Sequence, residues 1–220
     1  MAQWEGARGW PSWSLSNHDV TRFPTRLAND DPQRTKLMMA LLLALRGTAF
    51  IYQGDELGLP HGEVAFERLR DPEAIAFWPS GIGRDGARTP MPWSHDANMA
   101  GFTQAPDAWL PLDPRHRALA VDAQVGAPGS MLEFTRAAIA FRKSSAALRE
   151  GEFVALDAPE PVLAFERRSG QERLLCLFNL GPEPVRRPVA EGSARFAVGE
   201  AELKTSGAAL GGFSALFVAI

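Results

Sequence analysis

The order of apolar and polar positions in the first fifty residues predicts a strand, a helix and a second strand. Pro11–Ser16 alternates small polar with large apolar side chains, which is typical of a strand. Asp31 is a good N-cap for a helix that begins at Pro32, and Gly47 is expected to terminate that helix at its C′ position. Apolar residues recur between them at helical spacing: Leu37, Met38, Leu41, Leu42 and Leu45. Thr48–Tyr52 is a short apolar run of β type, so the order is that of a βαβ unit, which requires a parallel sheet.

The next segment, Gly58–Gly129, has many Pro, Gly and Trp residues and little periodicity. It predicts one weak helix, at Pro72–Phe77, within a loop that is too long for an ordinary connection; such loops usually carry function. Ser130 and Glu133 then form an S-x-x-E capping box. The helix that follows has one apolar face and extends to about Ser145.

After Gly151 the pattern changes to short β runs separated by turn residues, which predicts a small antiparallel all-β domain. The runs are Phe153–Leu156, Val162–Arg167, Arg173–Asn179, Val185–Val189, Ala194–Val198 and Ser214–Ile220. Two strands and two helices of α/β type do not close a sheet, because strand edges stay uncovered. Residues 1–148 are therefore either an unusual small sheet or, as we favour, the end of a larger domain whose start is absent.

Composition excludes several classes of protein. The 220 residues are 45% hydrophobic with a net charge of −3, which excludes low-complexity and collagen-like chains and leaves no basic stripe for nucleic acid or an anionic membrane. The single Cys176 forms no internal disulfide. The longest apolar run, Leu37–Leu45, is far shorter than a membrane span, and Met1–Trp10 has no apolar region of a secretory signal. The cytoplasm is thus the default expectation, since a signal peptide would lie upstream.

Candidate chemistry begins where the first predicted strand ends, at Asn17-His18-Asp19, because α/β enzymes place catalytic groups at the carboxyl ends of parallel strands. Taken alone, the dipeptide is more often the start of a loop. A Ser-His-Asp triad with Ser14 or Ser16 fails, because adjacent His and Asp point to opposite faces and the G-x-S-x-G elbow is absent. A metal site built from His18, His61, Asp55 and Glu63 has no recognised ligand spacing.

Three further features have a structural interpretation on composition alone. Asp55-Glu56 is expected to cap or salt-bridge the loop that follows the second strand. Arg84–Trp93 mixes charge, proline and an aromatic residue, which suits either a surface loop or a pocket wall. The tryptophans could stack on sugar rings, but most are expected in the core: Trp4, Trp10, Trp13, Trp78, Trp93 and Trp109.

Together these segments resemble the C-terminal third of the α-amylase family of glycoside hydrolases (family 13), in its bacterial α-glucosidase and oligo-1,6-glucosidase branch. The resemblance covers nearly the whole chain and is specific because several motifs occur in order at consistent spacing. The motifs are SLSNHDVTR (Ser14–Arg22), AFIYQGDELG (Ala49–Gly58), DPEAIAFWP (Asp71–Pro79), GRDGARTPMPW (Gly83–Trp93), Ala100–Phe102 and WLPLDPRHR (Trp109–Arg117).

The resemblance implies an α/β plus all-β chain, with the last two strand–helix units of a (β/α)8 TIM barrel followed by a small antiparallel β-sandwich. Residues 1–148 would supply strands 7 and 8, with an insert loop at about 58–129, and residues 149–220 would form the sandwich. The first six strand–helix units would be missing from these residues.

The resemblance also implies the roles of individual residues. Asp19 would be the catalytic transition-state stabiliser, and His18 would bind substrate hydroxyls in subsite −1. Arg88 would bind substrate and close the pocket at the non-reducing end by pairing with an acid from an early barrel loop, so we expect it to be unpaired here. Arg22 completes the pattern without a sugar contact, and Asp55 with its neighbour would build the end of the eighth strand. No cofactor and no metal is implied.

The expected function is that of the C-terminal portion of a retaining α-glucosidase acting on short malto- or isomalto-oligosaccharides. Its partners would be an α-glucoside oligosaccharide and the missing N-terminal barrel part, on the same or a separate chain, with no nucleic acid and no membrane. Because the motifs of the nucleophile and the general acid are absent, we expect these residues alone to be inactive. A transglucosylase of the same superfamily, or a non-catalytic sugar-binding subunit that completes a barrel with another chain, are the alternatives.

Overall fold

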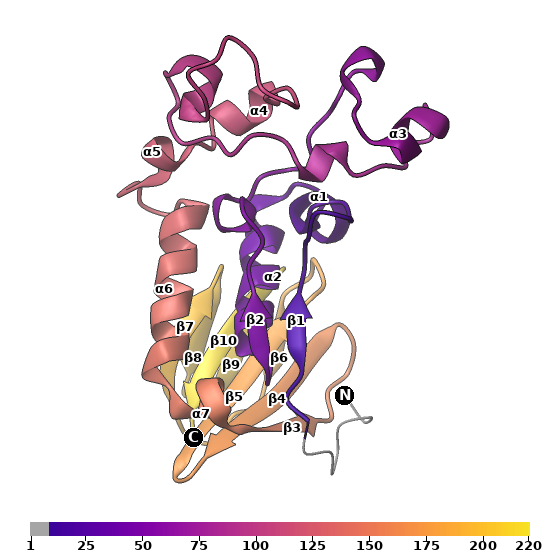
Figure 1. Cartoon of the computed structure of the whole chain (residues 1–220). Coiled ribbons are helices and arrows are strands. Elements are labelled where there is room, and N and C mark those ends of the chain that lie inside the picture. The colour runs from indigo at the N-terminus through magenta and orange to yellow at the C-terminus, as the bar shows by residue number, and fades with distance from the viewer. Residues whose placement is uncertain (1–8) are drawn as a thin grey trace. The chain divides into compact units, whose positions relative to one another are not determined.

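The computed structural model describes residues 9–220, which fall into two units (Figure 1). One unit contains the chain up to Trp13 together with Leu37–Phe50 and Ala138–Ile220, and the other contains Ser14–Lys36 and Ile51–Ala137. Trp4 and most of Met1–Trp10, the segment that lacks the apolar region of a secretory signal, lie outside the described residues. Within the described range, no helix combines the length and the apolar character that crossing a bilayer requires.

The predicted strand–helix–strand unit is present. Strand β1 (Ser12–Ser14) and strand β2 (Thr48–Phe50) are neighbours in a two-stranded sheet, and their arrows point the same way in Figure 1. Helix α2 (Pro32–Ala44) connects them and begins as predicted, with Asp31 Oδ1 accepting from the backbone N–H of Arg34 at 2.8 Å.

The predicted role of Gly47 was wrong, because α2 ends at Ala44, three residues before it. Gly47 instead has a φ of +131° where the chain passes the first strand. A Cβ atom at this position would lie 2.5 Å from the carbonyl oxygen of Pro11. The glycine therefore allows close approach of two backbones rather than terminating the helix.

Two arginines bind the carbonyl groups at the end of α2. Arg142, on helix α6 (Met131–Ser144), donates to the carbonyl oxygens of Leu45 at 3.1 Å and Gly47 at 2.7 Å. The last carbonyls of a helix have no partner within the helix, and a cation at this end also complements the helix dipole. Arg142 thereby satisfies the backbone of the turn that leads into β2.

Arg167, on strand β4 (Val162–Ser169), is fully buried and acts on the same helix end. Its guanidinium donates to the carbonyl oxygens of Ala44 at 2.5 Å, Gly151 at 3.0 Å and Glu152 at 3.3 Å. Burial lowers the pKa of Arg167 to about 10, so the group remains charged at neutral pH. These bonds connect α2, the loop after helix α7 (Ala146–Glu150) and the β domain within one unit.

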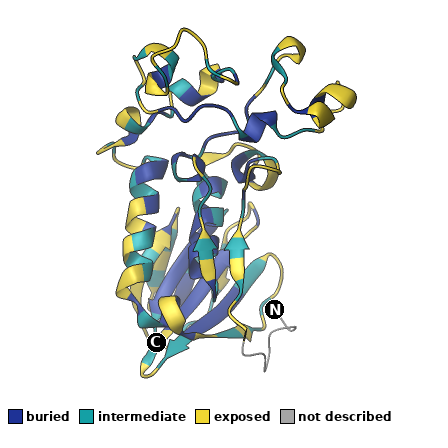
Figure 2. Cartoon of the chain, in the orientation of Figure 1, coloured by how far each residue is buried: buried dark blue, intermediate teal, exposed yellow. Residues whose placement is uncertain are grey.

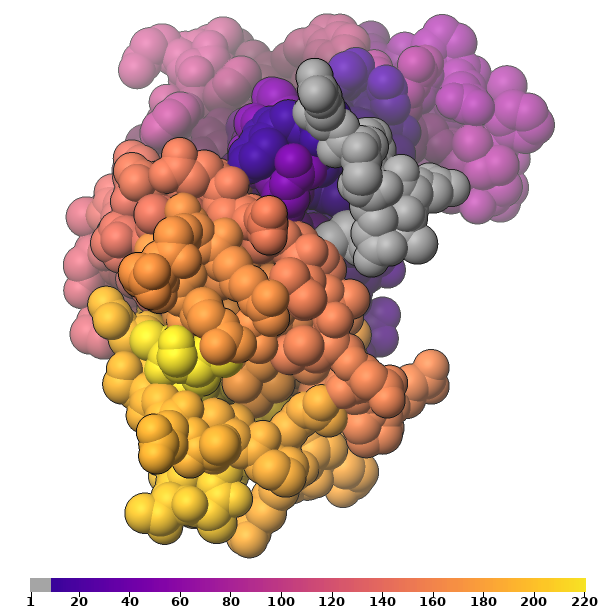
Figure 3. Space-filling model, turned by 90° about the horizontal axis from the view of Figure 1, so that it is seen from below, coloured from indigo at the N-terminus to yellow at the C-terminus, as the bar shows by residue number. Residues whose placement is uncertain are grey.

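The C-terminal residues form an antiparallel β domain of two sheets, as the sequence predicted. Figure 3 shows the surface of these residues, coloured from orange to yellow. The five-stranded sheet has the order β3–β4–β5–β10–β7, and the three-stranded sheet has the order β6–β9–β8. Two strands were not predicted, β8 (Ala201–Lys204) and β9 (Gly207–Leu210), because they are short and contain no β-branched or aromatic residue. The remaining bounds are β3 Glu152–Leu156, β5 Glu172–Asn179, β6 Val185–Arg187, β7 Ser193–Val198 and β10 Ser214–Ala219.

Strand β5 is buried on both faces (Figure 2). One face contributes Leu175 and Leu177 to the apolar cluster that includes residues of β9 and β10. On the other face the Phe178 ring lies 5.8 Å from Phe165 and 5.5 Å from Phe217, measured between ring centroids. The free thiol of Cys176 is fully buried in the middle of this strand, and burial raises its pKa.

The other unit is built from short helices, some of which begin at a side-chain cap. Asp71 accepts from Glu73 N at the start of α3 (Pro72–Ala76), which confirms the predicted helix apart from its last residue. Ser130 Oγ accepts from Glu133 N at 3.2 Å, but the Glu133 carboxylate accepts from Gly126 N, so half of the predicted capping box is formed. The other elements are α1 Phe23–Ala28, α4 Pro114–Arg117, α5 Val121–Gln124 and the 3₁₀ helices η2 Asp55–Leu57, η3 Phe66–Arg68, η4 Asp85–Ala87 and η5 Asn98–Gly101.

The substitution Arg167→Met is expected to lower the free energy of unfolding by about 2–4 kcal/mol, because three carbonyl groups lose their donor while the apolar volume is kept. Urea unfolding followed by far-UV circular dichroism measures this. Arg186→Met, at an exposed position of β6, is the matched control and should change stability by less than about 0.5 kcal/mol. Equal effects of the two substitutions would contradict the role assigned to Arg167.

Candidate active site

The turn after β1 places the predicted pair His18 and Asp19 together. The backbone N–H of Asp19 donates to Asn17 Oδ1 at 2.8 Å, which forms an Asx turn beyond the end of the strand. The imidazole Nε2 of His18 lies 3.3 Å from Asp19 Oδ2, and both side chains are more than half exposed. The expectation that the two side chains point to opposite faces was therefore wrong. The Ser16 hydroxyl accepts from the backbone N–H of Phe23 at 2.8 Å.

Arg88 reaches the same turn from the end of η4. Its Nη2 lies 3.0 Å from Asp19 Oδ1, and its Nε donates to the carbonyl oxygen of His18 at 2.9 Å. The expectation that Arg88 is unpaired was therefore wrong. Its side chain contacts an acid supplied by a turn of the same unit, 69 residues earlier in the chain.

A second guanidinium, which the sequence did not single out, faces Asp19. Arg84 Nη1 lies 3.8 Å from Asp19 Oδ1. Arg84 is held by two hydrogen bonds to the buried carboxylate of Asp71, at 2.9 Å from Nε and 2.6 Å from Nη2. These hydrogen bonds hold the pKa of Asp71 well below its usual range. Because Asp71 also caps α3, the position of Arg84 depends on that short helix.

The turn that carries both arginines requires glycine at two positions. Gly83 has a φ of +144°, and a Cβ there would lie 2.4 Å from the Cβ of Ala74. A Cβ at Gly86 would meet the carbonyl oxygen of Gly62 and Nε2 of His61, each at 2.4 Å. The spacing G-R-D-G thus has a steric reason that is independent of any ligand.

Arg22 connects the segments that carry the site. It is fully buried, and its guanidinium donates to the carbonyl oxygens of Gln53 at 2.6 Å and Ala87 at 3.0 Å. Its Cζ lies 5.3 Å from the centroid of the Tyr52 ring, whose hydroxyl also donates to Ala87 O. Burial lowers the pKa of Arg22. This side chain fixes the loop after β2 and the residue before Arg88 relative to the turn after β1.

The acidic pair after β2 binds its own turn. Asp55 Oδ2 accepts from the backbone N–H of Tyr52 at 3.2 Å, and Glu56 Oε2 accepts from that of Gly54 at 2.8 Å. Asp55 is fully buried, and burial raises its pKa to about 6 against the opposing effects of Ser16 and Arg22. The pair thus has the structural role that the sequence suggested.

The tryptophans of the described chain are mostly on the surface, and the expectation that most are core residues was wrong. Their exposed fractions are 46% for Trp10, 51% for Trp78, 52% for Trp93 and 61% for Trp109. Trp78, Trp93 and Trp109 belong to the unit with the short helices, which offers little regular structure against which large rings could be buried.

The arrangement around Asp19 is an exposed carboxylate faced by one imidazole and two guanidinium groups. The carboxylate can stabilise a developing positive charge, while the imidazole and the guanidinium groups donate hydrogen bonds to hydroxyl groups. Across residues 9–220, no group of three or more His, Cys, Asp or Glu side chains is placed to hold a metal ion.

Comparison with known proteins gives a consistent result. Residues 1–151 match the family model "Alpha amylase, catalytic domain". A probable alpha-glucosidase of Rhizobium meliloti (strain 1021) is 44% identical over 80% of this chain, and a probable oligo-1,6-glucosidase 2 of Bacillus subtilis (strain 168) is 30% identical over 80%. The crystal structure of an alpha-glucosyl transfer enzyme, XgtA, superposes with a TM-score of 0.90 at 42% identity over 99% of this chain.

The chain is much shorter than these proteins. It covers 32% and 35% of the length of the two curated relatives and 42% of the transfer enzyme. The activities named for these proteins therefore belong to longer polypeptides, and this chain matches only part of each.

The substitution Asp55→Asn is expected to change how stability depends on pH. A carboxyl whose pKa is raised from 3.8 to about 6 on folding stabilises the native state less as the pH rises through this interval. Between pH 4 and pH 7, the free energy of unfolding of the wild-type chain should fall by on the order of 2 kcal/mol relative to that of the variant. Urea unfolding of both chains over this range measures the difference, and parallel pH profiles would refute it.

Proposed function

The chain belongs to the α-amylase family of glycoside hydrolases, and we propose that it is the C-terminal portion of a retaining α-glucosidase that hydrolyses terminal α-glucosidic bonds of short malto- or isomalto-oligosaccharides. The observation that carries the proposal is the convergence of His18, Arg84 and Arg88 on the carboxylate of Asp19. The names of the relatives, which are α-glucosidases and oligo-1,6-glucosidases, support the substrate class.

In this proposal Asp19 stabilises the transition state. Retaining glycosidases pass through an oxocarbenium-like transition state, in which positive charge develops on the sugar ring. A fixed carboxylate beside the ring favours this charge, and the imidazole of His18 donates to ring hydroxyls in subsite −1. The exposure of both side chains leaves them accessible to a substrate.

Arg88 is proposed to bind substrate and to close the non-reducing end of the pocket. Its Nε and Nη2 are used by the turn at His18 and Asp19, but its Nη1 has no hydrogen-bond partner among the described residues. Arg88 Nη1 can therefore donate to a substrate hydroxyl or to an acid from another part of the barrel.

The remaining parts of the mechanism are assigned to residues outside this chain. We propose that residues 1–148 are the last two strand–helix units of the barrel, and that residues 149–220 are the β-sandwich that follows it. The nucleophile and the general acid come from the other barrel strands, on the same or a separate polypeptide. A retaining reaction needs both of these carboxylates about 5–5.5 Å apart.

Glucosyl transfer is the second candidate function. It is favoured by the likeness to the alpha-glucosyl transfer enzyme, which extends over nearly the whole chain. Hydrolysis and transfer share the glycosyl–enzyme intermediate and differ in the acceptor, water or a second hydroxyl compound. Product analysis with an α-glucoside and a competing alcohol separates the two.

In the enzyme that contains the complete barrel, Asp19→Asn is expected to lower kcat on an α-glucoside by about 10²-fold or more, because the charge that favours the transition state is lost. The variant Asp96→Asn is a matched control, since His95 and Asp96 form a similar exposed pair with Nδ1 2.8 Å from Oδ1. Steady-state kinetics with p-nitrophenyl α-D-glucopyranoside measures both. Unchanged kcat in Asp19→Asn would exclude the proposed role.

The 220 residues by themselves are expected to release no p-nitrophenol above the uncatalysed rate, because nucleophile and general acid are both outside them. The same assay on the purified chain tests this, with its Asp19→Asn variant as the reference for contaminating activity. Turnover by the chain that the variant abolishes would show that the catalytic carboxylates lie within these residues.

A further inference from the structure

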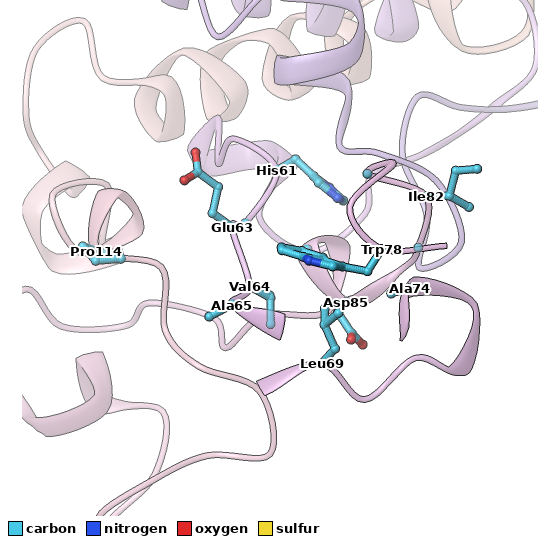
Figure 4. A pocket seen from close by; sticks show the side chains of 14 residues that line it. His61, Glu63, Val64, Ala65, Leu69, Ala74, Trp78, Ile82, Asp85 and Pro114 are labelled. Atoms are coloured by element: carbon cyan, nitrogen blue, oxygen red, sulfur yellow. The ribbon is translucent and has the colours of Figure 1, made fainter. Parts of the chain in front are cut away.

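A hollow of about 620 Å³ lies in the unit that contains Asp19, but it is not lined by Asp19, His18 or Arg88 (Figure 4). It is open to solvent, and its volume lies within the range of small-molecule sites. We propose that this hollow binds one pyranose ring of an oligosaccharide, as a sugar site separate from the Asp19 cluster. The proposal does not depend on the catalytic role of Asp19.

One wall of the hollow is the indole of Trp78. The ring is 51% exposed, and the Phe66 ring lies 5.7 Å from it between centroids at an interplanar angle of 48°. Ile82, Val64 and Leu69 add apolar surface. An exposed, laterally supported aromatic face next to apolar side chains is suited to the C–H face of a pyranose, which is also apolar.

A buried carboxylate lies behind the lining of the hollow. Asp85 is 2% exposed, and its Oδ2 accepts from the backbone N–H groups of Arg70 at 2.7 Å and Asp71 at 2.9 Å. Its Oδ1 has no hydrogen-bond partner within the described part of the chain. This oxygen is enclosed, so Asp85 contributes negative charge behind the lining rather than a direct contact with a ligand.

A donor lies on the same lining. His61 Nδ1 accepts from the backbone N–H of Arg22 at 3.4 Å, so the neutral ring carries its proton on Nε2. Burial, together with Arg22, lowers the pKa of His61 to about 4, which keeps the ring neutral at physiological pH. Nε2 donates to no group among residues 9–220, and it is therefore open to a ligand oxygen.

An exposed aromatic face beside one neutral donor fits a hydroxylated ring better than other ligands. Glu63, at the lining, and Asp85 disfavour an anion. An organic cation could stack on Trp78, but it would leave the Nε2 proton of His61 unpaired. A sugar ring has an apolar face for the indole of Trp78 and hydroxyl oxygens that accept from His61, so it satisfies both features.

The location is tested by titrating the ¹⁵N-labelled 220-residue chain with maltotriose and with isomaltotriose, and by following the tryptophan indole N–H resonances. The Trp78 resonance, assigned with a Trp78→Phe variant, is expected to shift in a saturable way with one of the two sugars. It should shift equally in the Asp19→Asn variant. No shift of Trp78, or a shift that Asp19→Asn abolishes, would overturn the proposal.

The contribution of the indole is tested by equilibrium dialysis with the sugar that shifts Trp78. Trp78→Ala should weaken binding at least about fivefold, while Trp109→Ala, at a similarly exposed tryptophan that does not line the hollow, should leave it unchanged. Equal effects of the two variants would refute the proposal. Displacement of the sugar by tetramethylammonium at equal concentration would instead assign the hollow to a cation.

Discussion

The hydrogen bonds from the buried guanidinium of Arg22 to main-chain carbonyls are the constraint on which the candidate site depends. A loop buried without regular structure leaves carbonyl oxygens unsatisfied, and a planar group with five donors can serve several of them at once. Arg22 does this for Gln53 and Ala87. The residue after Ala87 is Arg88. The hydrogen bond to Ala87 therefore also fixes the backbone position from which the Arg88 side chain extends to Asp19. Arg142 and Arg167 solve the same problem at the end of α2.

Much of this architecture could be predicted from periodicity and end signals. The βαβ unit, the start of α2 at Pro32 and the antiparallel C-terminal strands follow from local patterns, because their residues satisfy propensity and burial together. The family could be predicted because several motifs occur in order. Where local signals were weak, in the four-residue strands β8 and β9, prediction failed because β9 is stabilised by pairing with both β8 and β6.

The candidate site shows the limit of sequence reasoning more clearly. His18, Asp19 and Arg88 could be named from motifs, but the 3.0 Å contact between Arg88 and Asp19 joins residues 69 positions apart and depends on tertiary structure. Arg84 was missed because its role requires Asp71, whose sequence signal is that of a helix cap. The exposure of the tryptophans was not predicted for a related reason. Burial of a large ring depends on what surrounds it, and a segment of short helices provides few neighbours.

The burial of both faces of β5 has a practical consequence for experiments on this molecule. The only cysteine of the chain, Cys176, is fully buried in the middle of this strand, and burial disfavours its thiolate. Alkylating reagents attack the thiolate, so the native thiol is protected as long as the domain stays folded. The natural sequence can therefore serve directly as a background for attaching a spin label or fluorophore to one introduced surface cysteine, without first removing its own.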